Sequence, residues 1–172
     1  MFKKVLFCTD FSDNSHHAFP YALNLAVTYH ARLLILHVVV EQPYFDWSTP
    51  EGAQELIDQQ RRWVEQQAKT YYLSKMGEFE DYEILSREAG EGVAFHEIIQ
   101  AAKEQSVDLI LMGTHGRSGL DHLILGSTAE NVVRKSPCPV MVVRLPARKS
   151  DDLPVRHIGE RPDDRARAGD TR

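Results

Sequence analysis

Residues 108–116 read Asp108-Leu109-Ile110-Leu111-Met112-Gly113-Thr114-His115-Gly116, and nine residues separate this stretch from Gly126-Ser127-Thr128. The apolar run predicts a buried strand, and the glycines and serine after it predict a loop that leads into a helix. A glycine lets a ligand come close to the main chain. The unpaired N–H groups at the start of a helix face an anion, with the helix dipole behind them. The stretch therefore predicts a phosphate site that is built from main-chain groups.

The composition indicates one globular domain. The chain has 172 residues, of which 42% are hydrophobic and 26% are charged, and this is typical of a soluble protein with a single core. A formal net charge of −5 argues against a nucleic-acid-binding protein, since such proteins carry clustered basic surfaces. No apolar run reaches the roughly 18–20 residues that a membrane span requires. Cys8 and Cys138 have no metal-ligand spacing, so we expect two free thiols in a reducing cytoplasm.

Strand-like and helix-like patterns alternate along the chain. Apolar runs predict strands at residues 4–9, 32–40, 82–87, 109–112 and 140–145. Helical spacing predicts helices at residues 13–29, 50–76, 93–105 and 127–136. Pro20 is expected to kink the first helix or to delay its start, and Ser127 with Glu130 has the spacing of a capping box. The alternation predicts an α/β fold, a single-domain open five-stranded parallel sheet with helices on both faces.

Residues 1–146 are expected to form this one domain. The segment 147–172 has few large aliphatic residues, namely Leu153, Val155 and Ile158. Such a segment cannot bury enough apolar surface to offset the entropy of ordering it. We therefore expect a disordered, charged tail.

The glycine spacing resembles that of the universal stress protein family. Gly113-x2-Gly116-x9-Gly126-Ser127 is the pattern of the ATP-binding branch of that family, and three other segments match the family as well. These are Thr9-Asp10-Phe11-Ser12, Leu36-His37-Val38 and Ser136-Pro137-Cys138-Pro139-Val140. The similarity covers roughly residues 3–145 and implies the strand order 3-2-1-4-5. In that order the first and fourth strands are neighbours, and a crevice opens at their carboxyl ends.

The resemblance implies a role for each residue at that crevice. Backbone and hydroxyl donors of five residues are expected to hold the phosphates of ATP or another adenine nucleotide: Gly113, Gly116, Gly126, Ser127 and Thr128. Met112 is expected to line the ribose, and the main chain of Val38 to meet the adenine edge. Asp10, preceded by Thr9, is expected to contact the ribose or a Mg²⁺ or Mn²⁺ ion that the phosphates hold. His115 and Arg117 flank the loop, and Arg117 is expected to touch either phosphate or solvent.

Simpler interpretations stand beside these roles. The glycines could act as turn formers alone, and Ser127 could be only a helix cap, although capping and phosphate binding use the same geometry. Asp10 could be only the cap of the first helix, with Ser12 and Asp13 as competing caps. Cys8 stands where relatives often have proline, which could loosen the adenosine wall. No residue is assigned a catalytic role and no protein metal site is expected, because no nucleophile or ligand set has the required spacing.

The resemblance implies a regulatory, stress-response nucleotide-binding protein that is cytoplasmic and homodimeric. The apolar strand at Val140–Val143 lies at a sheet edge in the implied order, and in the family a second copy covers this edge. The chain lacks the Gly-x4-Gly-Lys-Ser/Thr pattern and a positioned base for water, so at most slow ATP hydrolysis is expected. Two alternatives stay open: a slow ATPase or adenylate-transferring enzyme of related fold, and a nucleotide-free dimeric interaction module. A further protein partner is expected, and the sequence does not identify it.

Overall fold

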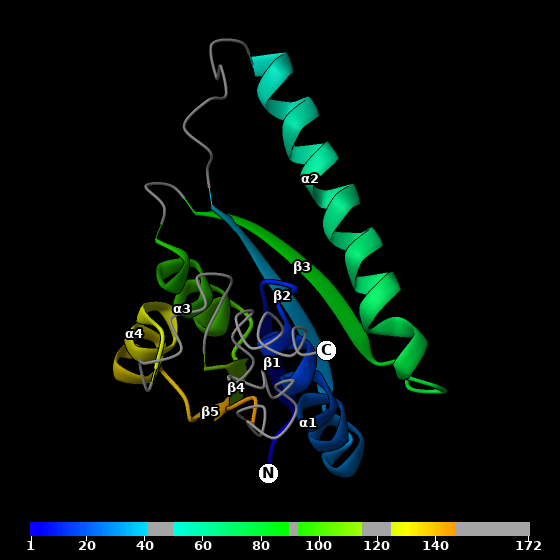
Figure 1. The fold of residues 1–172 in the computed structure, drawn as a ribbon, viewed down its shortest axis with the longest axis vertical. Coiled ribbons are helices and arrows are strands. Elements are labelled where there is room, and N and C mark those ends of the chain that lie inside the picture. The colour runs from blue at the N-terminus through cyan, green and yellow to red at the C-terminus, as the bar shows by residue number, and fades with distance from the viewer. Residues whose placement is uncertain (41–49, 90–92, 115–124, 147–172) are drawn as a thin grey trace, which may run out of the picture.

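The computed structural model describes residues 1–40, 50–89, 93–114 and 125–146. The predicted charged tail at 147–172 lies outside the described residues, as do His115, Gly116 and Arg117 of the predicted phosphate loop. Within the described part, strands and helices alternate as the sequence predicts (Figure 1).

Five parallel strands form one open sheet in the order β3-β2-β1-β4-β5. The strands are β1 (Lys4–Thr9), β2 (Arg32–Val40), β3 (Tyr82–Ala89), β4 (Leu109–Gly113) and β5 (Val140–Val143). This confirms the predicted fold class and strand order. β1 lies in the centre, paired with β2 and β4, where strands that are apolar on both faces are expected. β3 and β5 form the two edges.

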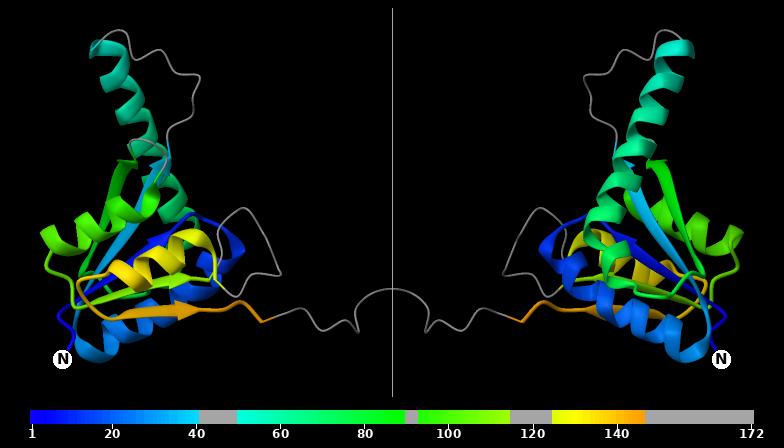
Figure 2. Two further views of the ribbon diagram at one scale, coloured as in Figure 1. Left: turned by 90° about the vertical axis from the view of Figure 1, so that its left-hand side faces the viewer. Right: turned by 90° about the vertical axis from the view of Figure 1, so that its right-hand side faces the viewer.

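Helices cover both faces of the sheet (Figure 2). They are α1 (Asp13–Tyr29), α2 (Pro50–Tyr71), α3 (Ala94–Glu104) and α4 (Ser127–Lys135). Alternate side chains of a strand point to opposite faces, so Val5 and Phe7 join an apolar cluster with α1 and α2, whereas Leu6 and Cys8 join a second cluster with α3 and α4. In the described ranges, no helix combines the length and the apolar character that crossing a membrane requires.

The first helix begins where the sequence predicts, although it contains a proline. α1 starts at Asp13 and runs through Pro20, so the predicted delay of its start is wrong. Ser12 is the N-cap residue, and its hydroxyl oxygen accepts a hydrogen bond from the Ser15 N–H at 3.4 Å. Proline cannot donate one main-chain hydrogen bond of the helix. The burial of the neighbouring Phe19 side chain stabilises the helix at this point and offsets that loss.

The second helix ends earlier than predicted. α2 stops at Tyr71 rather than Met76, and a 3₁₀ turn at Leu73–Lys75 (η1) follows it. Tyr72 between them still donates its N–H to the Ala68 carbonyl at 2.9 Å, with φ at −118° and ψ at −50°, and its ring is fully buried. The burial of a large aromatic ring outweighs the turn of helix that is lost.

The two edges of the sheet differ in chemistry. Beside the β3 edge, the Arg32 guanidinium donates to the Glu83 carboxylate at 2.8 Å, and Arg87 pairs with Glu104 on α3. The β5 edge consists of the apolar run Val140–Val143. A sheet edge that carries charged side chains resists pairing with another strand, whereas an apolar edge favours it.

Candidate functional site

The carboxyl ends of β1 and β4 lie side by side in the sheet. Cys8 of β1 is in register with Met112 of β4, so the residues that follow, Asp10 and Gly113, come to the same edge. From β1 the chain continues into α1 on one face, and β4 is followed by α4 on the other face (Figure 1). This is the kind of topological switch point at which open α/β sheets bind ligands.

Gly113 has a packing reason to be glycine. A Cβ added to it would lie 3.0 Å from the carbonyl carbon of Asn14 and 3.1 Å from the Asn14 oxygen. Both are main-chain atoms of α1, which cannot move aside without shifting the helix. The missing side chain therefore lets the first turn of α1 approach β4, independently of any ligand.

The ends of the loop after β4 are fastened to each other. The Thr114 N–H donates to the Val143 carbonyl at 3.1 Å, and the Gly126 N–H donates to the Thr114 carbonyl at 2.8 Å. The predicted loop residues between them lie outside the described ranges. Gly126 has φ −71° and ψ 155°, a conformation that any residue adopts. Its backbone geometry therefore does not explain why this position is glycine.

Helix α4 begins directly after the Gly126–Thr114 hydrogen bond. Gly126 is the N-cap residue, and its carbonyl accepts from the Glu130 N–H at 2.9 Å. Ser127 is the first helical residue, so the predicted capping box with Glu130 is wrong; the Glu130 carboxylate instead accepts from Arg134 at 2.5 Å. Glycine has no side chain that could cap the amides of the first turn. Those amides, including that of half-buried Thr128, receive no side-chain cap hydrogen bond from the N-cap residue and lie at the positive end of the helix dipole.

Asp10 holds the residue that caps α1. One of its carboxylate oxygens accepts from the Ser12 N–H at 3.1 Å and from the Ser12 hydroxyl at 2.6 Å. Ser12, not Asp10, is the N-cap, so the interpretation of Asp10 as the cap itself is wrong. The Asp10 side chain is partly exposed at the strand edge. A carboxylate held in this way is oriented before any ligand arrives.

The Thr9 hydroxyl group forms hydrogen bonds within the protein. Its hydroxyl oxygen lies 2.5 Å from Tyr72 Oη and 3.1 Å from Ser15 Oγ. The same oxygen accepts a hydrogen bond from the Phe11 N–H at 2.9 Å. The Thr9 carbonyl oxygen lies 2.8 Å from His37 Nδ1. These bonds fix the end of β1 and, with it, the position of the next residue.

Apolar side chains lie behind the strand ends on the α3 and α4 face. Met112 and Cys8 are buried there, and half-buried Val38 packs against them. Burial raises the pKa of the Cys8 thiol well above its usual range. Both cysteines are free, as predicted, and Cys138 is half-buried. The residues predicted to line the ribose and adenine thus share one face and one cluster.

Phe11 is a residue that the sequence analysis did not single out as part of the site. It has φ 60°, which a bulky side chain rarely adopts. Its ring lies among the rings of His37, Trp63 and Tyr72. The Thr9-Asp10-Phe11-Ser12 segment was the available signal, but nothing local in it reveals a left-handed residue or partners that are distant in the chain.

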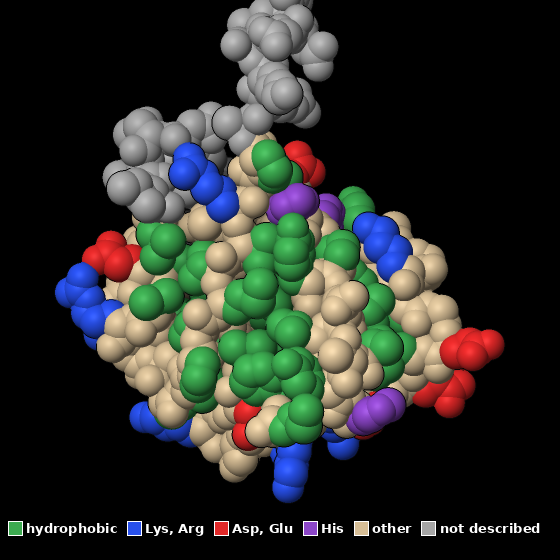
Figure 3. All heavy atoms as spheres, turned by 90° about the horizontal axis from the view of Figure 1, so that it is seen from below, with side chains coloured by type: hydrophobic (Ala, Val, Ile, Leu, Met, Phe, Trp, Pro, Cys, Tyr) green, Lys and Arg blue, Asp and Glu red, His purple; other side chains and the backbone are tan. Residues whose placement is uncertain are grey.

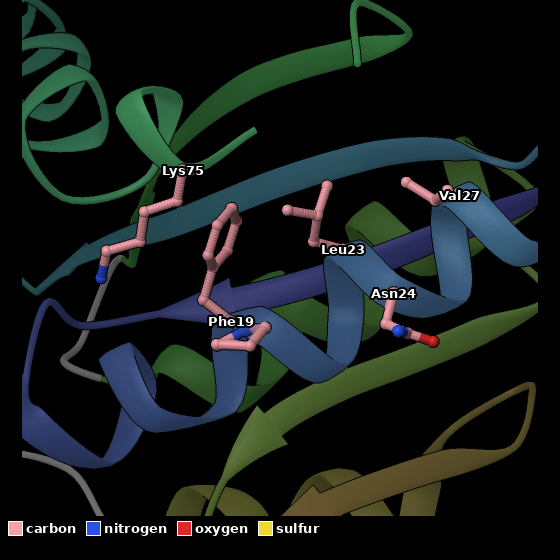
Figure 4. Close-up of a pocket in the computed structure, with 6 residues that line it drawn as sticks. Phe19, Leu23, Asn24, Val27 and Lys75 are labelled. Atoms are coloured by element: carbon pink, nitrogen blue, oxygen red, sulfur yellow. The ribbon is translucent and has the colours of Figure 1, made fainter. Parts of the chain in front are cut away.

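One cavity lies away from the strand ends. It measures about 310 Å³ and occupies the outer side of α1 next to η1 (Figure 4). Its lining residues are Phe19, Pro20, Leu23, Asn24, Val27 and Lys75. The lining is mostly apolar, with Asn24 and Lys75 as its two polar residues, and neither Asp10 nor Gly113 contributes to it. Within the described ranges, no group of three or more His, Cys, Asp or Glu side chains could hold a metal ion.

A model of the universal stress protein family matches residues 1–144 of this chain. The chain is 36% identical over 149 residues to universal stress protein MJ0531 of Methanocaldococcus jannaschii, across 87% of this chain and 86% of that protein. It is also similar to the solved structure of universal stress protein UspA from Lactobacillus plantarum. That likeness has a TM-score of 0.68 and 27% identity, and it covers 83% of this chain and 97% of the other.

Two further solved structures share the fold and are described with a nucleotide. One is a universal stress protein in complex with cAMP, with a TM-score of 0.53, 24% identity, and coverage of 83% of this chain and 96% of the other. The second is a family protein from Arabidopsis thaliana with AMP bound, with a TM-score of 0.52, 20% identity, and coverage of 90% of this chain and 97% of the other. At these identities the likeness is one of fold.

Proposed function

The chain belongs to the universal stress protein family, and we propose that it binds an adenine nucleotide, ATP, at the carboxyl ends of β1 and β4. The bound nucleotide acts as a regulatory ligand: it shifts the protein toward the conformation that it binds better. In this proposal the protein is a cytoplasmic homodimer and not a dedicated enzyme.

The arrangement around Gly126 carries the proposal. Its N–H is bonded to Thr114, its conformation does not require glycine, and it offers no side chain to cap α4. A phosphate beside it would accept hydrogen bonds from the amides of Ser127 and Thr128 and would meet the positive end of the helix dipole. This would explain why the position is glycine, because a larger side chain at Gly126 would occupy the space of the phosphate.

The remaining residues fit the other parts of the nucleotide. The Asp10 carboxylate can accept hydrogen bonds from ribose hydroxyl groups or bind a Mg²⁺ or Mn²⁺ ion held by the phosphates. Met112 and Val38 supply an apolar wall for the ribose and base. His115, Gly116 and Arg117 are proposed to complete the phosphate loop. The cAMP and AMP complexes of proteins with this fold support an adenine nucleotide as the ligand class.

Pairing of two copies through β5 is the second part of the proposal. The carbonyl group of Pro139 accepts a hydrogen bond from Ile110 of β4, and that of Val143 accepts one from Thr114, directly after β4. Since bonding alternates along a strand, the main-chain groups of Val140 and Val142 point away from β4, where another strand can pair with them. α1 and β5 lie on the lower side of the molecule in Figure 1, and Figure 3 shows hydrophobic side chains gathered in the middle of that side with charged ones toward its rim.

Titration calorimetry with ATP and Mg²⁺ tests the nucleotide site. Gly126→Val should weaken ATP binding by about tenfold or more, because the branched side chain fills the phosphate space. Arg134→Val is the matched control, since it places the same side chain at an exposed position in the last turn of the same helix. A folded Gly126→Val protein with unchanged affinity would reject the site. Mass spectrometry of the small molecules released from purified protein identifies the nucleotide directly.

A further inference from the structure

Phe11 occupies a backbone conformation that costs energy. It stands directly between Asp10 and the N-cap residue Ser12, with φ at 60°. Bulky residues avoid this left-handed region because Cβ crowds the main chain. Such conformers persist only where surrounding contacts hold them, and they concentrate at functional sites.

The left-handed residue has a direct effect on the carboxylate beside it. It reverses the chain between β1 and α1, so that the Asp10 carboxylate meets both the N–H and the hydroxyl of Ser12. On its other side, the Phe11 N–H donates to the Thr9 hydroxyl oxygen at 2.9 Å. The left-handed residue therefore lies between two local hydrogen bonds, one to the Thr9 hydroxyl oxygen and one to the Asp10 carboxylate.

The ring of Phe11 supplies the contacts that hold this conformer. Its centroid lies 4.9 Å from that of His37 on β2, 5.5 Å from Trp63 and 5.8 Å from Tyr72. Tyr71 adds a fourth ring at 6.4 Å. We call these four residues the aromatic clamp. Trp63 and Tyr71 belong to α2, so the docking of α2 and the conformation of Phe11 depend on each other.

We propose that Phe11 is a positioning residue for the nucleotide, whose ring, held by the aromatic clamp, keeps the turn that presents the Asp10 carboxylate. This inference rests on the proposed nucleotide site. The docking of α2 then sets the affinity for the nucleotide. When the aromatic clamp loosens, Phe11 can leave its left-handed conformation, and the Asp10 carboxylate moves away from the ligand. By linkage, a nucleotide that contacts Asp10 also favours the docked position of α2.

A double-mutant cycle between Phe11 and Asp10 separates positioning from general damage. Phe11→Ala should lower the affinity for ATP with Mg²⁺ about five- to tenfold in the wild-type background. It should cause no further loss in an Asp10→Ala background, because the group that it positions is gone. Equal losses in both backgrounds would overturn the inference, since they would mean that Phe11 acts independently of Asp10.

Matched variants control for the loss of an aromatic ring. Phe2 pairs edge-to-face with Tyr29 at 5.3 Å, near the amino end of β1, so Phe2→Ala removes a similar contact away from the site and should leave affinity within about twofold. Phe11→Tyr keeps the ring and should restore wild-type affinity. Trp63→Ala should weaken binding in the same direction as Phe11→Ala. Wild-type affinity in both Phe11→Ala and Trp63→Ala would also overturn the inference.

Hydrogen exchange at the Ser12 amide gives a readout that needs no nucleotide. This N–H donates to the Asp10 carboxylate, so its exchange should accelerate in Phe11→Ala to the rate seen in Asp10→Ala, and not in Phe2→Ala or Phe11→Tyr. Unchanged protection in Phe11→Ala would refute the positioning of Asp10. If the wild-type protein bound no adenine nucleotide, the proposed function would fail, and the Ser12 amide would still decide whether the clamp positions Asp10.

Discussion

The Thr9 hydroxyl oxygen lies 2.5 Å from the phenol oxygen of Tyr72, which joins the end of β1 to the residue that follows α2. Burial raises the pKa of Tyr72 to about 12, so the phenol keeps its proton at neutral pH and the pair shares a neutral hydrogen bond. Thr9, the residue next to Asp10, is thereby tied to the residue that directly follows α2, the helix that carries Trp63 and Tyr71 of the aromatic clamp.

Tyr72→Phe tests the strength of this tie. The ring is retained and the hydrogen bond to Thr9 is lost, so the free energy of unfolding in urea should fall by about 0.5–1.5 kcal/mol. ATP affinity should stay within about twofold, since the stacked contact with Phe11 remains. Tyr21→Phe, at an exposed position on α1, is the control and should leave stability unchanged. Equal stability of the two variants would contradict the assigned bond.

The two glycines of the site should respond differently to alanine. Gly113→Ala places Cβ against the main chain of Asn14 and should cost about 1–3 kcal/mol of unfolding free energy. Gly126→Ala is compatible with φ −71° and should change stability by less than about 0.5 kcal/mol. Thermal or urea unfolding of both variants measures the contrast. A stable Gly113→Ala protein would show that α1 and β4 are less closely packed than described.

His16 should make stability depend on pH. Its ring stacks on Tyr71 at 4.1 Å, its Nε2 is buried without a partner among the described residues, and burial, reinforced by the Lys75 charge, lowers the pKa of His16 below 6.5. Between the folded pKa and 6.5 the unfolded chain binds more protons than the folded protein. The free energy of unfolding therefore rises with pH across this interval and falls as the pH drops through it.

His16→Phe keeps the stacked ring and removes the titration. Urea unfolding between about pH 5 and 8 should show a smaller pH dependence in this variant. His96→Phe, at an exposed position on α3, is the control and should keep the wild-type profile. Parallel profiles for His16→Phe and the wild type would exclude His16 as the source of the dependence.

The two thiols should react at different rates. Desolvation raises the pKa of Cys8, so its reactive thiolate is scarce and inaccessible in the folded protein. Cys138 is half-buried and should be modified first by a thiol reagent at neutral pH, with mass mapping of the labelled peptide as the measurement. Cys138→Ser should react only on unfolding. Fast labelling of that variant in the folded state would contradict the burial of Cys8.

Val142→Pro tests pairing through β5. The substitution removes an N–H that points away from β4, so the sheet should stay intact while the homodimer dissociates. Met141→Pro removes an N–H on the β4 side and should instead destabilise the fold. Light scattering gives the mass and circular dichroism the folding of each variant. A dimeric Val142→Pro protein would place the contact between copies elsewhere.

Much of the fold could be predicted because its signals are local. The run in β2 is apolar on both faces, and this indicates a central parallel strand without any knowledge of its neighbours. The end of α2 could not be predicted in the same way. α2 ends at Tyr71, directly before Tyr72, whose ring is buried in the core, and only the assembled sheet shows where that core lies.

The sequence predicted which strand ends form the candidate site, but it did not predict how the side chains there are oriented. Asp10 and Gly113 meet because β1 and β4 are neighbours, which follows from the strand order. The capping box at Ser127 failed because the N-cap residue of α4 is Gly126, which has no side chain that a sequence pattern could identify as a cap. The clamp around Phe11 was missed because its partners are distant in the chain and its backbone conformation contradicts the local preference of phenylalanine.

In the proposed homodimer, the differing chemistry of the two sheet edges would limit further self-association. The ion pair between Arg32 and Glu83 beside β3 discourages the addition of a further strand there, while the valines of the opposite margin are complementary to themselves. A molecule with two adhesive margins would grow head to tail into an open filament. With a single adhesive edge, the proposed pairing would close on its own copy about a two-fold axis, and growth would stop at that step. In that dimer, the charges beside β3 would oppose polymerisation.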